Sequence, residues 1–190
     1  MIETTDLDEP IGLDAPAGAD GDRKNHLRDF QARLSERLRQ ANAAPRAASL
    51  GLLIGDQRWL VDLSEAGEIV PIPSMVTMVP LTRDWFRGLV NLRGTLYGVT
   101  DLLRLSGDAA TPVVKESRLL ALAASLNVNA ALVVTRMLGL HDAQAWRVEP
   151  QRQHWAPWAG RCLVDPDGRE WFELSLARLA ADERFLSVSR

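Results

Sequence analysis

Three pairs of short apolar segments, each pair separated by two turn residues, restrict the fold of this chain more than any other feature. Two apolar runs around a turn of this composition are typical of a β-hairpin. Their repetition predicts a mainly β body of many short strands, as in small barrels. The turns are centred on Gly55 and Asp56, Arg93 and Gly94, and Asp167 and Gly168.

Three other segments carry weaker signals. Residues 68–80 combine β-branched residues with prolines, which fits edge or irregular strands. In residues 117–140 leucine and alanine favour a helix, but Asn127 and Asn129 stand where a hairpin would turn. We predict two strands there. Residues 174–186 have the spacing of one or two helical turns.

The first 45 residues differ in composition from the rest. Residues 1–22 hold seven acidic residues and no lysine or arginine, which predicts a disordered acidic tail. Residues 23–45 repeat apolar side chains every three or four positions and end at a proline, which predicts an amphipathic helix. The main domain is then residues 46–190. The apolar face of the helix is formed by Leu27, Phe30, Leu34 and Leu38.

Composition and charge argue against several functional classes. The N-terminus has acidic residues where a secretory signal would be basic, and the apolar window 119–134 is shorter than a membrane span. We therefore expect a cytoplasmic protein without a membrane-inserted segment. Outside the tail, 22 basic residues face 18 acidic ones without a basic stripe, so we expect no nucleic-acid partner.

No local pattern of a catalytic or metal site is found. The chain lacks GxSxG, the phosphate-binding loop GxxxxGK[ST] and HExxH, and its three histidines are far apart in sequence. We predict no catalytic residue, no cofactor and no metal. Cys162, the single cysteine, is interpreted as a small buried residue. Trp155 and Trp158 favour core packing or a partner surface over a ligand pocket.

The segments GEIVPI (67–72), VTMVP (76–80) and GLVNLRGTLYGVTDL (88–102) together resemble the CheW-like chemotaxis coupling proteins. The resemblance covers roughly residues 48–188, and the form of residues 80–102 is similar to coupling proteins of pilus chemotaxis systems that control twitching motility. The positions that match the family pattern are Glu68, Ile69, Pro80, Gly88, Asn91, Arg93, Gly94, Asp101 and Leu102.

Two positions depart from the family pattern. Gly98 stands where the family often has proline, and Thr135 stands where it often has aspartate. Surface details near both positions are therefore not carried over from the family.

The resemblance implies two SH3-like five-stranded β-barrels packed together, to which the apolar spacing adds the N-terminal helix and a short C-terminal helix. It also implies a non-catalytic adaptor. Such a protein joins the cytoplasmic tip of a methyl-accepting chemoreceptor, in clusters at the cell pole, to the regulatory domain of a CheA-type histidine kinase. The output implied by the pilus-type segment is twitching motility by type IV pili. Whether the chain forms homo-oligomers is left open.

The same resemblance suggests a set of partner-binding or signalling residues, without saying which face binds kinase and which binds receptor. We expect Arg93 to pair with Glu68 near the junction of the barrels, in a partly buried contact whose truncation costs roughly 3 kcal/mol. The other interpretation of Arg93 is a solvated turn residue. The set is Glu68, Ile69, Val70, Gly88, Leu89, Val90, Asn91, Arg93, Gly94 and Asp101.

Gly88 carries a further expectation. We expect a close backbone approach there, so that Gly88→Asp abolishes coupling and leaves the protein folded. Two functions of other classes remain as alternatives: a nucleic-acid module on small barrels, and a hydrolase that assembles distant serine, histidine and aspartate residues.

Overall fold

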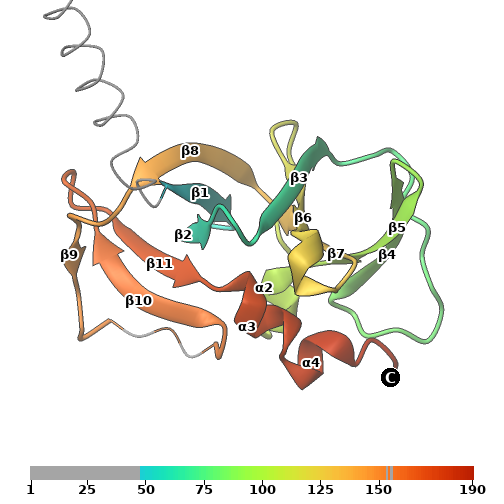
Figure 1. The fold of residues 1–190 in the computed structure, drawn as a ribbon. Helices are drawn as coiled ribbons and strands as arrows, with labels where there is room; N and C mark the ends of the chain where they lie inside the picture. Colours follow the sequence, from blue (N-terminus) through green and yellow to red (C-terminus); the bar gives the residue numbers. More distant parts are fainter. Residues whose placement is uncertain (1–47, 153, 155) are drawn as a thin grey trace, which may run out of the picture. The chain divides into compact units, whose positions relative to one another are not determined.

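The computed structural model of this chain describes residues 48–152, 154 and 156–190 (Figure 1). The expected acidic tail (1–22), the expected N-terminal helix (23–45) and Trp155 lie outside the described residues. The described residues belong to one compact unit, Arg46–Arg190.

Two β-sheets make up this unit, and one is inserted into the other in sequence. The first sheet has the order β8-β1-β2-β11-β10-β9, and the second has the order β3-β6-β7-β5-β4. All five strands of the second sheet therefore lie between β2 and β8 of the first. The strands of the first sheet are β1 (Ala48–Ile54), β2 (Gln57–Asp62), β8 (Arg136–Asp142), β9 (Arg147–Val148), β10 (Ala159–Val164) and β11 (Glu170–Leu174). Those of the second are β3 (Ala66–Pro71), β4 (Phe86–Leu92), β5 (Thr95–Thr100), β6 (Arg118–Leu122) and β7 (Ala130–Val134).

Most neighbouring strands are antiparallel, as hairpins require. Each sheet also has one parallel pair, β2 with β11 and β5 with β7. The mainly β body and its division into two small barrels are confirmed. The two-residue strand β9, which adds a sixth member to the first sheet, was not expected.

Short helical segments complete the unit. The 3₁₀ turn η1 follows β6, and the C-terminal part contains two helices that confirm the expected one or two helical turns. Each of these helices begins at a side-chain cap, Ser175 for α3 and Asp182 for α4. The segments are α2 (Leu102–Leu105), η1 (Ala124–Leu126), α3 (Leu176–Ala180) and α4 (Glu183–Leu186).

The three predicted hairpins are all present. The strand pairs β1–β2, β4–β5 and β10–β11 are antiparallel and are joined at the expected turns. Gly55, Gly94 and Gly168 each have a positive φ, at 60°, 89° and 80°. A backbone of this kind favours glycine, which explains why these turns could be recognised from sequence.

The ambiguous segment 117–140 forms strands and no α-helix, as predicted, but it contains the first part of β8 in addition to the two expected strands. The strands β6 and β7 are buried on both faces, so apolar residues run continuously instead of alternating with polar ones. This double burial explains the helix-like composition. Asn127 adopts a left-handed backbone in the connection, with φ 54°.

The two faces of β6 and β7 enter different cores. One face joins the main core, which also contains Leu52, Ile54 and Trp59 of the first sheet. The other face fills the interior of the second barrel together with Val90 and Val99. The residues of the first face are Leu120, Leu122, Ala130, Leu132 and Val134. Those of the second are Leu119, Ala121, Ala131 and Val133.

Two apolar residues singled out in the sequence lie in the interior. Trp158 is fully buried in the main core, so the core interpretation is confirmed. Cys162 is buried, and burial raises the pKa of its thiol. Both observations agree with its interpretation as a small packed residue.

The two departures from the family pattern have local explanations. The Thr135 hydroxyl accepts a hydrogen bond from the Gly55 N–H at 2.9 Å, and the Thr135 N–H donates to the Leu53 carbonyl at 2.9 Å. Thr135 therefore ties the β7–β8 connection to the β1–β2 turn. The Gly98 N–H donates to the Asn129 carbonyl at 2.9 Å, a bond that proline could not make.

The proline-containing segment 68–80 behaves as expected. Its first part is the edge strand β3, which pairs only with β6 on the described part of the chain. The rest is irregular, apart from an isolated bridge between Thr77 and Leu89. Within the described residues, no helix has the length and apolar character needed to cross a membrane.

Candidate partner-binding surface

The β4–β5 hairpin presents Arg93 at its tip in a fixed backbone geometry. Arg93 and Gly94 both have positive φ, at 51° and 89°, which is the pattern of a type I′ turn. The Asn91 Oδ1 atom accepts a hydrogen bond from the Gly94 N–H at 2.7 Å. Asn91 therefore stabilises the turn that carries the arginine.

Arg93 pairs with Glu68, as the sequence suggested. The Nη2 atom of Arg93 lies 2.9 Å from Oε1 of Glu68. The strands β3 and β4 are the two edge strands of the second sheet. Glu68 lies on β3, and Arg93 lies at the tip of the hairpin that begins with β4, so the ion pair links the two edges. Both residues belong to the second barrel, so the pair does not bridge the two barrels.

The burial expected for this pair is also wrong. The side chain of Arg93 is 83% exposed, and that of Glu68 is 34% exposed. Ion pairs this accessible to water contribute at most about 1 kcal/mol, because solvent screens the charges and two long side chains lose freedom. The cost of roughly 3 kcal/mol expected for a partly buried pair does not apply.

Asp101 is in the interior and not on the surface. Its side chain is 0% exposed and accepts the Thr111 hydroxyl at 2.6 Å, while Arg87 donates to its Oδ2 atom at 3.2 Å. It also caps α2 by accepting the Arg104 N–H. Asp101, expected among the partner-binding or signalling residues, therefore has no exposed side chain with which to touch a partner in this structure.

Gly88 is held by a close backbone approach, as expected. A Cβ atom at Gly88 would lie 2.3 Å from the Thr77 carbonyl oxygen, and the residue has φ 129°. The Thr77 carbonyl itself accepts the Leu89 N–H at 2.8 Å. Any side chain would therefore disturb this strand contact, and we expect Gly88→Asp to destabilise the fold.

The remaining expected residues divide by exposure. Ile69 is exposed on β3, while Val70 and Leu89 are half-buried. Val90 is buried in the core of the second barrel. The surface members of the set form what we call the Glu68–Arg93 rim: Glu68, Ile69, Asn91, Arg93 and Gly94.

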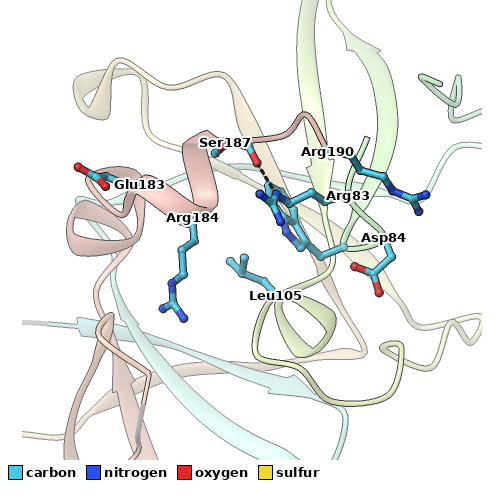
Figure 2. Close-up of a pocket in the computed structure, with 8 residues that line it drawn as sticks. Arg83, Asp84, Leu105, Glu183, Arg184, Ser187 and Arg190 are labelled. Carbon is cyan, nitrogen blue, oxygen red and sulfur yellow. Dashed lines mark hydrogen bonds between the residues drawn. The ribbon is translucent and has the colours of Figure 1, made fainter. Parts of the chain in front are cut away.

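A cavity of about 780 Å³ lies between the segment 83–85, α2 and the C-terminal residues (Figure 2). Charged side chains dominate its walls, and Arg83 Nε donates to the Ser187 carbonyl at 3.1 Å. No group of three or more His, Cys, Asp or Glu residues within the described part of the chain is arranged to hold a metal. The charged lining residues are Arg83, Asp84, Glu183, Arg184 and Arg190.

Sequence reasoning missed one group of exposed apolar residues. Met75, Met78 and Leu81 lie between β3 and β4, with exposed fractions of 79%, 84% and 84%. The available signal was a run of large apolar residues beside prolines with neither helical nor strand periodicity. That signal predicts irregular or edge strand and does not by itself indicate an exposed apolar surface.

This chain is similar in sequence to proteins of a known family. The CheW-like domain family matches residues 49–184. Protein PilI of Pseudomonas aeruginosa is 29% identical over 101 residues, which is 53% of this chain and 56% of PilI. The match thus spans about half the length of that relative. It agrees with the branch of the family indicated by residues 80–102.

A solved structure has the same fold. The scaffolding protein TtCheW from Thermoanaerobacter tengcongensis superposes with a TM-score of 0.57 and 19% sequence identity. The superposition covers 67% of this chain and 88% of TtCheW. The family resemblance drawn from the sequence is confirmed, together with its two-barrel fold.

Substitution of two glycines in β4 and its turn tests the close approach at Gly88. We expect Gly88→Ala to lower the free energy of unfolding by about 2 to 4 kcal/mol, because the new methyl group meets the Thr77 carbonyl at a strained φ. Gly94→Ala is the matched control. It also has positive φ but open space around its Cβ position, so only about 1 kcal/mol is expected. Equal midpoints of urea denaturation for the two variants would contradict the account.

Two substitutions compare the buried and the exposed charge. Asp101→Ala should lower the free energy of unfolding by about 3 kcal/mol or more, because it leaves Arg87 and the Thr111 donors without their acceptor. Arg93→Ala should lower it by less than about 1 kcal/mol. Urea denaturation followed by tryptophan fluorescence measures both. A loss for Arg93→Ala as large as that for Asp101→Ala would show that the exposed pair is structural.

Proposed function

This chain belongs to the CheW-like domain family, and on that premise we propose that it is a non-catalytic adaptor between a chemoreceptor and a histidine kinase. Its partners in this proposal are the regulatory domain of a CheA-type kinase and the cytoplasmic tip of a methyl-accepting receptor. It would act in the cytoplasm, at receptor clusters, and would control twitching by type IV pili. Residues 46–190 form the coupling domain.

One observation carries the proposal: the Glu68–Arg93 rim stands on a turn of defined geometry, and its arginine remains exposed. The type I′ turn and the Asn91 bond hold Arg93 in place. Arg93 nevertheless remains 83% exposed. A charged side chain that is preorganised, accessible and of little use for folding is suited to recognition by a partner, where such charges set specificity and association rate.

The interior of the fold supports an adaptor more than an enzyme. The single cysteine is buried with a raised thiol pKa, and Asp101 is occupied by Thr111 and Arg87. These groups are therefore committed to packing and to local hydrogen bonds. The accessible polar side chains of the rim are the turn arginine, the carboxylate that pairs with it and the Asn91 amide, which bonds the turn.

Isothermal titration calorimetry tests the proposal directly. We expect the wild-type chain to bind the regulatory domain of the CheA-type kinase and a soluble receptor fragment from the same organism. Arg93→Ala should weaken at least one of these complexes by about tenfold. The matched control is Arg147→Ala, which removes an exposed ion pair to Glu149 (2.8 Å) from the other sheet and should leave both affinities unchanged.

A charge exchange then separates recognition from support. The double variant Arg93→Glu with Glu68→Arg restores an ion pair but reverses both charges. We expect its affinity to stay low, because a partner that reads the charge at the hairpin tip meets the wrong sign. Full recovery in the double variant, or no binding of either partner by folded wild-type protein, would contradict the proposal.

A further inference from the structure

A groove of about 750 Å³ lies beside the long connection between β3 and β4 and shares no residue with the Glu68–Arg93 rim. Its walls come from residues 72–87, from α2 and from the last residues of the chain. Arg83, Asp84 and Arg190 also line the neighbouring cavity, and Figure 2 shows their side chains gathered on one side of it. The two hollows therefore adjoin.

The inner wall of the groove is apolar. Val99 of β5 and Val133 of β7, both members of the second barrel's core, line it together with Phe86. The groove thus opens onto one end of a packed core. Val99 and Val133 are themselves buried, so the exposed apolar surface comes from the side chains at the edge of the groove. Exposed apolar side chains that lie together mark an interaction site in many soluble proteins.

The edge of the groove carries large exposed apolar side chains. Met78 and Leu81 are each 84% exposed, and Val113 is 55% exposed. Methionine adapts its shape to different partners, which makes it common on binding surfaces. Each of these three side chains reaches solvent at the edge of the apolar wall.

Leu81 is displayed at a conformational cost. Its φ is 60°, in the left-handed region that is unfavourable for a leucine, and burial does not offset this because the side chain faces water. The Leu81 carbonyl accepts the Arg190 N–H at 3.1 Å, which ties the segment to the end of the chain. The structure therefore holds this apolar side chain outward.

The charges of the groove have one dominant sign. Four arginines and one carboxylate, Asp84, line it. Asp84 pairs with Arg104 at 3.5 Å, and the interior Asp101 pairs with Arg87 at 3.2 Å. Arg83 bonds the neutral Ser187 carbonyl, and within the part of the chain that the structure describes neither Arg83 nor the Arg190 guanidinium has an ion pair. Positive charge thus remains available for an acidic partner.

We propose that this groove binds an acidic amphipathic α-helix of a protein partner. The apolar stripe of such a helix would lie against Phe86, Met78 and Leu81, as in other complexes where a helix fills a groove. Its carboxylates would meet the flanking guanidinium groups, whose planar donors match a carboxylate. The inference deepens the proposed adaptor function, and rests on it, because an adaptor needs a second binding surface in addition to the Glu68–Arg93 rim.

Fluorescence anisotropy with a designed peptide tests the groove. The probe is a labelled peptide of about 18 residues with leucine on one helical face and glutamate on the other. We expect binding by the whole chain that weakens by about tenfold in Arg190→Glu and in Met78→Ser. Leu81→Gly should also weaken binding without loss of stability, because glycine accepts the φ of 60°.

Matched controls come from the other sheet. Arg136→Glu and Leu140→Ser change an exposed arginine and an exposed leucine of β8, and should leave peptide affinity unchanged. Equal binding of a peptide with lysine in place of glutamate would overturn the proposal, as would groove variants that bind like wild type. Binding to phosphatidylglycerol vesicles that is lost in the same variants, without peptide binding, would assign the groove to a membrane and also overturn it.

Titration of the kinase regulatory domain in parallel separates this inference from the proposed function. If the wild-type chain binds the kinase domain, but the groove variants bind the peptide as tightly as the wild type does, the inference about the groove alone is overturned. Peptide binding that depends on the groove, in a chain that binds neither kinase nor receptor, supports the groove and overturns the adaptor role.

Discussion

The double burial of β6 and β7 is the constraint on which the rest of the structure depends. Alternate residues of these strands enter the main core and the core of the second barrel, so that Leu119 and Leu120 serve different interiors. Loss of either core would expose one face of both strands to water. Burial of apolar surface is the main driving force for folding, so the two barrels support each other.

The buried strands β6 and β7 leave the edge strands of the second sheet as the part that can contact other proteins. β3 and β4 are its edge strands, and the Glu68–Arg93 pair links β3 to the hairpin that contains β4. The connection between the same two strands carries Met78, Leu81 and the arginine-lined groove. An adaptor needs a rigid centre and more than one accessible surface, and the architecture supplies the centre through packing and the surfaces through its edges.

Local signals predicted much of this structure. The turns at Gly55, Gly94 and Gly168 were recognisable because a positive φ selects glycine, and the pairing of Arg93 with Glu68 followed from the family resemblance. The burial of Asp101 could not be predicted, since it depends on Thr111 and Arg87 folding around the carboxylate. The arginine-lined groove was likewise hidden, because Arg83, Arg104 and Arg190 meet only when α2 and the chain's last residues pack beside residues 72–87. Interactions between distant segments leave no local pattern.

Simultaneous binding of both partners is the central claim for this protein. Sedimentation velocity of the chain mixed with the regulatory domain of the CheA-type kinase and a soluble receptor fragment measures it most directly. The account predicts a species that contains all three components and sediments faster than either pair. A mixture in which the receptor fragment displaces the kinase domain, leaving only binary complexes, would contradict it.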